Sequence, residues 1–283
     1  MMKIFVTGAN GYLGRNFINK AIKKNFKIFA VTRKRKNKKL KNVKWLVGRI
    51  DQKWNELAKA DVLLHFATVG AYDKFSNINK TLNFNVSLST RLLINSIESN
   101  CKKWIIVSTN KEKKIQRILK TKKINKKNFS EPHFNYALSK YLFTKIAKDF
   151  SKFFNVKCRI VKLFHVYGKD EKKTRLWPLL NYHSKNDKDL DMTSGNQTYD
   201  FNHIDDVIDG LIECIDFRVK NKNFPQEWDL ASGKSMTVRE FAKKIWKKNK
   251  AKGKINFSSI KNFDDANYLV DKKILWKINH RKI

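Results

Sequence analysis

The stretch KIFVTGANGYLG, residues 3–14, decides the fold of this chain. An apolar run breaks directly into three glycines, Gly8, Gly11 and Gly14, and this spacing predicts a strand, a tight turn and a helix. Gly8 permits the sharp turn, Gly11 lets backbone approach a diphosphate, and Gly14 lets the helix pack closely on the strand. The amino end of the helix would face the anion, so the stretch predicts a dinucleotide-binding turn, although an ordinary strand-to-helix turn can carry the same glycines.

The rest of the chain favours the dinucleotide interpretation, because apolar strand-like runs alternate with amphipathic helix-like stretches. The predicted fold class is α/β, with a doubly wound parallel (Rossmann) sheet. Strands are expected at residues 27–32, 43–47, 61–67 and 102–110, and helices at 15–24, 54–59, 83–100 and 134–150. We expect residues 1–165 to form the Rossmann domain and 166–283 a smaller α/β substrate lobe, with 201–214 packing back on the first domain and ligands in the cleft between the two.

The turn and the ends of the early strands supply the cofactor contacts that we expect. The turn contributes Gly8, Asn10, Gly11, Tyr12, Leu13 and Gly14, and the backbone of Phe66, Ala67 and Thr68 would lie against the cofactor after the fourth strand. The second strand ends in Thr32, Arg33, Lys34 and Arg35 rather than in an acidic residue. An acidic residue would bind a ribose 2′-hydroxyl, whereas guanidinium groups suit a 2′-phosphate. The predicted cofactor is NAD(P), with NADP favoured over NAD, although these cations could merely open a lysine-rich loop.

The net charge of +37 would ordinarily indicate a polyanionic partner such as nucleic acid or an anionic membrane. Lysine far outnumbers arginine, and asparagine and isoleucine are abundant, as an AT-rich coding sequence produces without selection for a partner. The densest basic runs, 34–44 and 111–127, contain no aromatic residue on which bases could stack. We therefore interpret the lysines as a solvated surface that binds nucleic acid only non-specifically.

Segment lengths and cysteine spacing indicate the cellular location that we expect and the state of the cysteines. No segment approaches the length of a membrane span, and the first two residues run straight into a strand, which leaves no room for a signal peptide. We expect a cytoplasmic protein with no membrane partner. Cys101, Cys158 and Cys214 are widely spaced and match no metal pattern, so they are expected to be reduced, buried thiols, and no metal site is predicted. His65, inside the fourth strand, is interpreted as a structural interior residue.

A candidate catalytic set lies between residues 102 and 150. The fifth strand delivers a hydroxyl at Thr109, and the helix 134–150 places Tyr136 and Lys140 one turn apart on the same face. A phenol with a pKa near ~10 is a poor acid or base at neutral pH, but an adjacent ammonium stabilises the phenolate and brings that pKa toward the working range. Thr109 would share a substrate oxygen with Tyr136. The spacing Tyr-x-x-x-Lys alone arises by chance on many helices, and only its order after the glycine turn and the Thr109 strand makes it persuasive.

Taken together, these stretches resemble the extended short-chain dehydrogenase/reductase family, in its group of nucleotide-sugar epimerases, dehydratases and ketoreductases. The matching stretches cover nearly the whole chain: TGANGYLG, the HFA strand end, Asn85, VST, YALSK, LFHVYG (163–168), TSGNQTYDFNHIDDV (193–207) and WDLASGKSMTVREFA (228–242). The resemblance implies that Thr109, Tyr136 and Lys140 are catalytic, and that Tyr136 and Lys140 also contact the cofactor. It further implies a sugar-nucleotide pocket along 165–200, with the candidate contacts His165, Arg175, Gln197 and Tyr199, and a homodimer through the helices at 83–100 and 134–150.

The chain also departs from that family. Arg49 follows Gly48 after the third strand, where relatives often carry an acidic residue, so the adenine contacts stay open. Asn110 and Lys111 occupy the places of the Asp-Glu pair of the dehydratase subgroup, which disfavours a 4,6-dehydratase. The Arg-Asp-Phe pattern that helps to bind substrate phosphate in relatives is Tyr199-Asp200-Phe201 here, and His165 replaces the usual Asn. The substrate diphosphate must then find other cations, for which Arg175 and the lysines of 111–127 are candidates.

Two functions follow from these observations. The first is an NAD(P)-dependent oxidoreductase acting on a nucleotide-linked hexose, most simply a 4-keto-sugar reductase, with a 4-epimerase next. The alternative is a catalytically inactive scaffold of the same family that binds RNA or another polyanion, which the high charge and the missing arginine at Tyr199 support. The joint presence of Thr109, Tyr136 and Lys140 favours the enzyme, because such a scaffold would need none of these three side chains.

Overall fold

A computed structural model describes residues 1–34, 39–121, 126–131, 133–220, 223–260 and 269–281 of the chain. The chain divides into two compact units, of which the first comprises residues 1–163 and 210–228 and the second comprises 164–209 and 229–283. The chain therefore leaves the first unit after Leu163 and returns to it at Gly210. The sequence-based division at residue 165, with 201–214 packing back, stays a prediction.

The elements of the first part of the chain, in order, are β1 (Lys3–Thr7), α1 (Tyr12–Ala21), a 3₁₀ turn (Ile22–Lys24), β2 (Lys27–Thr32), β3 (Val43–Val47), β4 (Val62–His65), α2 (Ile78–Leu82), a π-helical segment (Asn83–Leu88), α3 (Ser89–Glu98), β5 (Lys103–Thr109), α4 (Glu112–Thr121), a 3₁₀ turn (Lys126–Ser130), α5 (Phe134–Phe153) and β6 (Lys157–Leu163). They are followed by β7 (His165–Tyr167), α6 (Leu176–Lys185), β8 (Leu190–Met192), β9 (Thr198–His203), α7 (Ile204–Ile215), β10 (Gln226–Ala231), β11 (Ser235–Thr237), α8 (Val238–Lys248), β12 (Ile255–Phe257), a 3₁₀ turn (Lys272–Ile274) and β13 (Leu275–Lys277).

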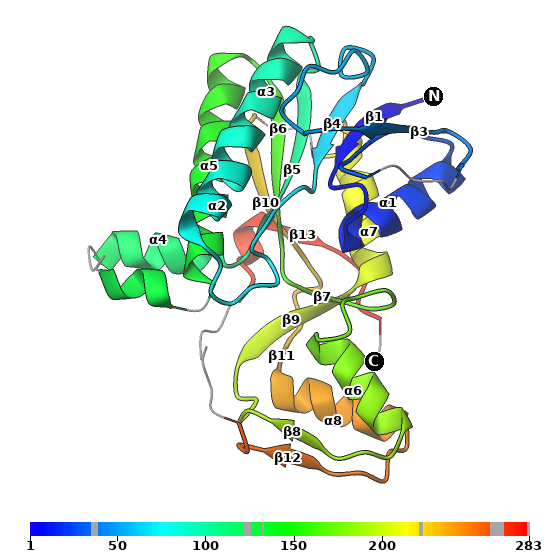
Figure 1. Ribbon diagram of the computed structural model, residues 1–283, viewed down its shortest axis with the longest axis vertical. Helices are drawn as coiled ribbons and strands as arrows, with labels where there is room; N and C mark the ends of the chain where they lie inside the picture. The colour runs from blue at the N-terminus through cyan, green and yellow to red at the C-terminus, as the bar shows by residue number, and fades with distance from the viewer. Residues whose placement is uncertain (35–38, 122–125, 132, 221–222, 261–268, 282–283) are drawn as a thin grey trace. The chain divides into compact units, whose positions relative to one another are not determined.

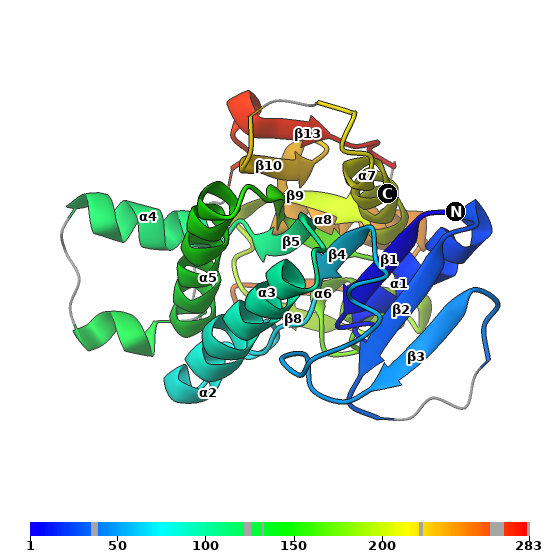
Figure 2. The same ribbon diagram turned by 90° about the horizontal axis from the view of Figure 1, so that it is seen from above.

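The first unit is built on a parallel sheet with the strand order β6-β5-β4-β1-β2-β3 (Figure 1). Beyond β6 the sheet continues into β10, whose first three residues belong to this unit. Helices α3 and α5 lie on one face of the sheet and α1 lies on the other (Figure 2). This arrangement confirms the predicted doubly wound parallel sheet. The strand order reverses between β1 and β4, and in such sheets ligands bind outside the carboxyl ends of the strands at that point.

The strands predicted at residues 27–32 and 43–47 have these bounds in the structure, but the helix predicted at 54–59 is wrong. That segment forms turns, closed by backbone hydrogen bonds that span only three residues. Leu57 is its one fully buried side chain, and Trp54 is held by a hydrogen bond from its indole Nε1 to the Arg49 carbonyl at 3.2 Å. A single anchoring residue does not make the apolar stripe that a surface helix needs.

The long amphipathic stretch predicted at 83–100 also differs from a single regular helix. It begins earlier, as α2, and continues through the π-helical segment into α3. Segments with the π-helical pattern occur mostly as single turns inside α-helices, and they are frequent at functional sites. The segment contains Asn85, which is buried.

The core of the first unit lies between the sheet and helices α3 and α5. It joins strand residues such as Phe5 and Leu63 to Leu92 and Phe143 on the helices. His65 belongs to this interior, because its Nδ1 lies 2.7 Å from the Thr7 hydroxyl and its ring packs against Phe143. Burial lowers the pKa of His65 to about 3, so the ring is neutral at ordinary pH. The interpretation of His65 as structural is confirmed.

The three cysteines are likewise buried and free, as predicted. Burial raises the pKa of all three thiols, that of Cys101 to about 12. A thiol with a raised pKa is a poor nucleophile and a poor metal ligand at neutral pH. These residues therefore act as small core side chains.

Arg159, on β6, holds the returning segment 210–228 in the first unit. Its guanidinium is fully buried and donates to the backbone carbonyls of Cys214 at 2.7 Å and Asp216 at 3.1 Å, and to that of Val219. Its Nε donates to the Gln226 side chain at 2.9 Å. Buried charges persist when hydrogen bonds replace their water, and these bonds link β6 to a segment far along the chain.

The second unit has a core of its own. Strand β9 pairs in parallel with β7 and antiparallel with β11, and β8 pairs in parallel with β12. Helices α6 and α8 contribute Leu180 and Phe241 to a cluster with Tyr167 and Phe201, in which the rings of Phe201 and Phe241 stack at 3.9 Å. Strand β13 pairs with the last residues of β10. This unit thus carries a small sheet and helices, and its role as a substrate lobe stays a prediction.

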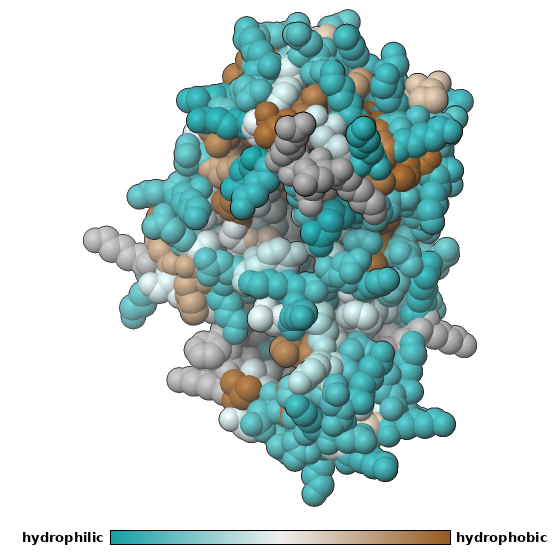
Figure 3. All heavy atoms as spheres, turned by 45° about the vertical axis from the view of Figure 1, so that its right-hand side comes forward, coloured by the Kyte–Doolittle hydropathy of each residue, from teal (hydrophilic) through white to brown (hydrophobic). Residues whose placement is uncertain are grey.

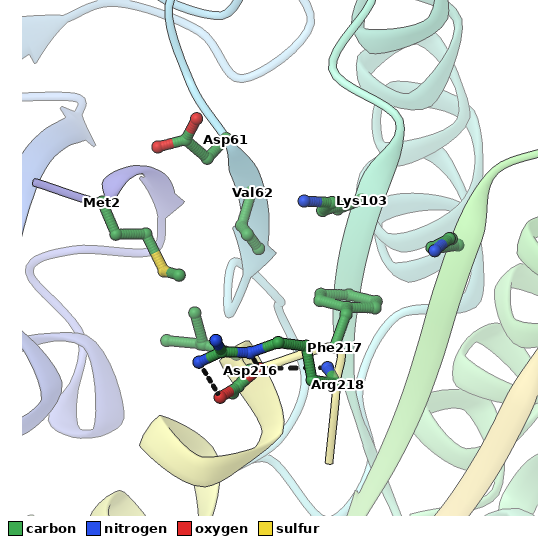
Figure 4. A pocket seen from close by; sticks show the side chains of 9 residues that line it. Met2, Asp61, Val62, Lys103, Asp216, Phe217 and Arg218 are labelled. Carbon is green, nitrogen blue, oxygen red and sulfur yellow. Dashed lines mark hydrogen bonds and ion pairs between the residues drawn. The ribbon is translucent and has the colours of Figure 1, made fainter. Parts of the chain in front are cut away.

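The amino ends of the strands in the first unit are basic. Strands β1, β2, β5 and β6 each begin with an exposed lysine, and Lys103 and Lys157 are register partners. A cavity of about 420 Å³ lies at this edge, lined by Met2, Asp61, Val62, Lys103, Lys157 and residues 215–218 (Figure 4). Its acidic and basic rim residues Asp216 and Arg218 pair with each other at 2.8 Å. This edge is opposite to the carboxyl ends of the strands, where the glycine turn lies.

Most residues on the molecular face drawn in Figure 3 are hydrophilic, with apolar residues scattered among them. Among the helices of the described ranges, none combines the length and the apolar character needed to cross a membrane.

Candidate active site

The glycine turn after β1 lies directly against the end of β4. Gly8 has a φ of +69°, and a Cβ on it would lie 2.6 Å from the backbone nitrogen of Ala67. A Cβ on Gly14 would lie 2.3 Å from the carbonyl oxygen of Gly8. Neither position has room for a side chain, so the glycines allow the turn, α1 and the Phe66–Ala67 backbone to meet at the carboxyl edge of the sheet.

The amino end of α1 fits an anionic ligand. Its cap residue, Gly11, offers no side-chain acceptor, and the first turn, which holds Tyr12 and Leu13, contains no acidic residue. The first N–H groups of a helix have no partner within the helix, and the helix dipole adds partial positive charge, so a helix start of this composition suits an anion. Asn10 supports the turn through a hydrogen bond from its side chain to the Thr32 hydroxyl at the end of β2. The residues predicted for the diphosphate of a dinucleotide are thus present in a suitable arrangement.

The end of β2 keeps its basic character. Thr32 is buried, and its hydroxyl donates to the carbonyl of Lys34 at 3.0 Å. Arg33 is exposed next to it. Arg35 lies outside the described residues. The arrangement leaves the Arg33 guanidinium accessible beside the turn that Asn10 and Thr32 hold.

Tyr136 meets hydroxyl groups from two strand ends. It lies near the start of α5 with 8% of its surface exposed, and its phenol lies close enough to the hydroxyls of Thr109, the last residue of β5, and of Thr68, just after β4, for both to affect its pKa. The structure therefore brings together Tyr136 and Thr109, as the sequence predicted. The contact of the Thr68 side chain was missed, because only the Thr68 backbone was expected to matter.

Lys140 lies one helical turn beyond Tyr136 and is 3% exposed. Its Nζ donates to the carbonyl of Val107 on β5 at 2.8 Å and lies 5.8 Å from the centre of the Phe143 ring. Burial lowers the pKa of Lys140 to about 8, while the negative charge of Glu112 opposes this shift. The ammonium therefore titrates close to neutral pH, as few lysines do.

The pKa of Tyr136 is shifted in the opposite direction to the one expected from the Tyr-x-x-x-Lys spacing. Burial raises it first, and the negative charges of Glu112 and of ionised Tyr72 raise it further. The nearby hydroxyls of Thr68 and Thr109 lower this pKa, but they do not outweigh burial. The protein's own groups therefore keep the phenol protonated, which suits a proton donor.

Asn85 holds the segment beside Tyr136. Its Nδ2 donates to the Val69 carbonyl at 3.0 Å and to the Ser139 hydroxyl at 2.9 Å. Its Oδ1 accepts from the Val69 N–H at 2.9 Å and from the Thr68 hydroxyl at 3.1 Å. The amide thus ties the loop after β4 to the face of α5 between the two candidate catalytic residues. In the sequence, only the family resemblance singled out Asn85.

The predicted substrate contacts lie in the second unit. His165 on β7 and Tyr199 on β9 pack with their ring centres 5.6 Å apart, and Phe201 lies 4.8 Å from His165. Gln197, just before β9, is buried, and its carbonyl accepts a hydrogen bond from the N–H of Val238 at 2.9 Å. The structure brings His165 and Tyr199 together on neighbouring strands of one small sheet.

Arg175, the predicted partner of a substrate diphosphate, caps the start of α6. Its Nε donates to the carboxylate of Glu171 at 3.2 Å. Burial raises the pKa of Glu171 to about 7, although the charge of Arg175 opposes this shift. A phosphate at Arg175 would thus have to share the guanidinium with Glu171.

Comparison with known proteins extends these observations. The profile of the NAD dependent epimerase/dehydratase family matches residues 4–225. The CDP-abequose synthase of Salmonella muenchen is 26% identical over 275 residues, which cover 93% of this chain and 86% of the relative. The solved UDP-glucose 4-epimerase of Thermotoga maritima has a TM-score of 0.77 at 17% identity and covers 96% of this chain and 91% of its own. TunA, an NAD dependent NDP-hexosamine 5,6-dehydratase, has a TM-score of 0.76 at 20% identity, with coverages of 96% and 88%.

Proposed function

The chain belongs to the NAD dependent epimerase/dehydratase family, and on that basis we propose that it is an NAD(P)-dependent oxidoreductase acting on a nucleotide-linked hexose. The observation that carries the proposal is that the buried phenol of Tyr136 and the Thr109 hydroxyl are close enough for Thr109 to affect the pKa of Tyr136, at the same sheet edge as the glycine turn. The reaction proposed first is the reduction of a 4-keto sugar, and 4-epimerisation is the second candidate.

In this proposal Tyr136 moves a proton to or from the sugar oxygen, and Thr109 holds the same oxygen. The nicotinamide, when bound, supplies or accepts the hydride. A protonated phenol suits reduction, because the oxygen of a keto group gains a proton as the carbon gains a hydride. Lys140 would hold the ribose of the cofactor. Its pKa of about 8 lets it exchange protons near neutral pH.

For the cofactor we propose NADP rather than NAD, which goes beyond the family description. The support is the end of β2, where Arg33 is exposed and no acidic residue follows Thr32. A reductase consumes free NADPH at each turnover, whereas an epimerase recycles one tightly held NAD. Equilibrium binding of NADPH and NADH, to the native protein and to Arg33→Ala, tests the choice. A preference for NADH in the native protein contradicts the role of Arg33 and favours the epimerase.

The second unit would contact the substrate through His165, Gln197 and Tyr199, with Arg175 toward the diphosphate. A 4,6-dehydratase stays disfavoured, because Asn110 and Lys111 offer no acid–base pair after Thr109. A panel of nucleotide sugars and their 4-keto derivatives tests the whole proposal. Loss of absorbance from the reduced cofactor identifies a reductase, and product analysis identifies an epimerase or a dehydratase. If no member of the panel is turned over, the inactive scaffold becomes the better description.

We also propose a homodimer through helices α3 and α5. Both helices expose apolar residues, and Ile94 on α3 and Leu142 on α5 have 40% and 36% of their surface accessible. Sedimentation velocity of the native protein and of Leu142→Glu tests this surface. A dimer that becomes a monomer in the variant supports the proposal, and a monomeric native protein contradicts it.

A further inference from the structure

Glu112 is a buried carboxylate that the proposed mechanism does not use. It begins α4, three residues after Thr109, and is fully buried. Its Oε1 accepts hydrogen bonds from the Thr144 hydroxyl, at 2.7 Å, and from the Ser108 hydroxyl. Its Oε2 lies 3.4 Å from the Nζ of Lys162 on β6. A carboxylate removed from water needs partners of this kind to replace its hydration.

These contacts are one of three places where the end of β5 approaches α5. Helix α5 presents Tyr136, Lys140 and Thr144 at intervals of four residues, so they lie on one face. The last three residues of β5, 107–109, each connect to one of them. Lys140 donates to the carbonyl of Val107, and Glu112 joins the hydroxyl of Ser108 to that of Thr144. The phenol of Tyr136 lies near the hydroxyl of Thr109, which affects its pKa.

Other charged groups surround this carboxylate from neighbouring elements. Lys162 also pairs with Glu227 on β10, and Glu227 pairs in turn with Lys148 on α5. Lys162 therefore keeps a partner if the charge of Glu112 is removed. His65 on β4 faces the ammonium of the catalytic lysine, but it is neutral at ordinary pH.

We propose that Glu112 is a positioning residue of the active site, which holds the end of β5 against α5 and sets the electrostatic potential at Tyr136 and Lys140. Its negative charge raises the pKa of both groups. Removing that charge should therefore lower both values, because the phenolate becomes easier and the ammonium harder to form. Only the turnover measurement below rests on the proposed function.

The test is the substitution Glu112→Gln, which keeps the shape of the side chain and removes its charge. The primary measurement is an NMR titration of protein labelled with [ε-¹³C]lysine. Lys140, with a pKa of about 8, titrates apart from surface lysines near ~10.4 and is assigned by the loss of its signal in Lys140→Arg. We expect the pKa of Lys140 to fall by roughly half a unit or more in Glu112→Gln. The charge-retaining Glu112→Asp should stay close to the native value.

The matched control is Glu98→Gln on α3, which removes the same charge from a side chain that is 53% exposed and should leave Lys140 unchanged. If Glu112→Gln does not fold, the double variant Glu112→Gln with Lys162→Met removes both charges of the buried pair and should shift Lys140 in the same direction. A folded variant with an unchanged Lys140 titration overturns the proposal and leaves Glu112 with a purely structural role.

The pH dependence of kcat/KM gives an independent measurement. In Glu112→Gln both limbs of the profile should move to lower pH, whereas a loss of stability alone would leave them in place. Limbs that do not move in an active, folded variant contradict the proposal. If the native protein turns over no nucleotide sugar, the proposed function fails, and the lysine titration still decides the role of Glu112.

Discussion

The two edges of the parallel sheet in the first unit have opposite chemistry, although the same strands form both. At the amino edge, β1, β2 and β5 begin with the exposed lysines Lys3, Lys27 and Lys103. At the carboxyl edge the same strands end in the buried hydroxyls Thr7, Thr32 and Thr109. The hydroxyls of Thr7 and Thr32 bond to His65 and Asn10, and that of Thr109 lies near the phenol of Tyr136. The lysines are solvated independently of one another, whereas the hydroxyls connect segments far apart in the sequence.

The comparison shows that the presence of a cavity alone does not identify the candidate active site. The cavity at the amino edge is lined by apolar residues and exposed lysines, and its pair Asp216–Arg218 is satisfied internally (Figure 4). The carboxyl edge instead collects a protonated phenol, an ammonium with a lowered pKa and the open end of a helix. Substitutions at the carboxyl edge should therefore change activity, and those at the amino edge should not.

The largest effect is expected from Tyr136→Phe. Removing the phenol hydroxyl should lower turnover by ~10²- to 10⁴-fold, because proton transfer to the sugar oxygen loses its donor, while cofactor affinity stays near the native value. Steady-state kinetics and cofactor titration measure the two effects. Lys103→Gln at the amino edge is the control and should keep native turnover. Native turnover in Tyr136→Phe would remove this residue from the mechanism.

The next largest effect is expected from Gly14→Ala. The added Cβ would lie 2.3 Å from the Gly8 carbonyl oxygen, so α1 must shift, at a cost of about 1–3 kcal/mol in unfolding free energy. The shift also moves the amino end of the helix, and cofactor affinity should fall. Gly11→Ala is the matched comparison, because its Cβ would meet the same oxygen at 3.1 Å. Urea unfolding that ranks the two variants equally would contradict this account.

A smaller effect, which depends on pH, is expected from His65. Its pKa is about 3 in the folded protein and near ~6.5 in the unfolded chain, so the unfolded chain binds the proton first on acidification. This group should therefore cost about 2 kcal/mol of stability between pH 6.5 and pH 5, a cost absent above pH 6.5. Urea unfolding of His65→Gln should show a shallower loss over this range, and His183→Gln on α6 is the control. Equal slopes in His65→Gln and in the native protein would refute the assignment.

The smallest effect is expected at the amino edge. Lys103 and Lys157 are neighbours in register, and like charges in such positions repel each other. Lys157→Glu should raise the unfolding free energy by about 0.5 kcal/mol or less at low salt, and the gain should vanish in 1 M salt because ions screen exposed charges. Thermal unfolding at two salt concentrations measures it. A change in turnover in this variant would contradict the claim that substitutions at the amino edge leave activity unchanged.

Much of the first unit could be predicted from the sequence, because its turns and strands follow from residues that are close together in the chain. The glycine turn follows from residue spacing, and β2 and β3 follow from short apolar runs with clear boundaries. The proximity of Tyr136 and Thr109 was predicted because both were expected to hold the same substrate oxygen. The helix at 54–59 was predicted wrongly because the apolar residues of this segment fit a short helix. In the structure the segment forms turns, and Leu57 alone is buried.

The features missed in the site depend on distant partners. Glu112 lies in a run of lysines that was interpreted as a solvated surface, and nothing local shows that Thr144 and Lys162 would bury its carboxylate. The raised pKa of Tyr136 is equally invisible in the sequence, since it follows from the depth of burial. The local sequence pattern predicts where helices and strands lie. The burial and the pKa values of charged groups in the interior depend instead on tertiary contacts.

Arg159 has a consequence for the order in which the chain is made. Every strand from β1 to β6 has been synthesised once Leu163 has been added, yet the carbonyls that bind the Arg159 guanidinium belong to Cys214, Asp216 and Val219. Until these residues emerge, a nascent first unit would have to bury a cation without its acceptors, which is strongly unfavourable. The first unit is therefore completed only after residues 164–209 have been synthesised, so a truncated chain ending near residue 165 should not be stable.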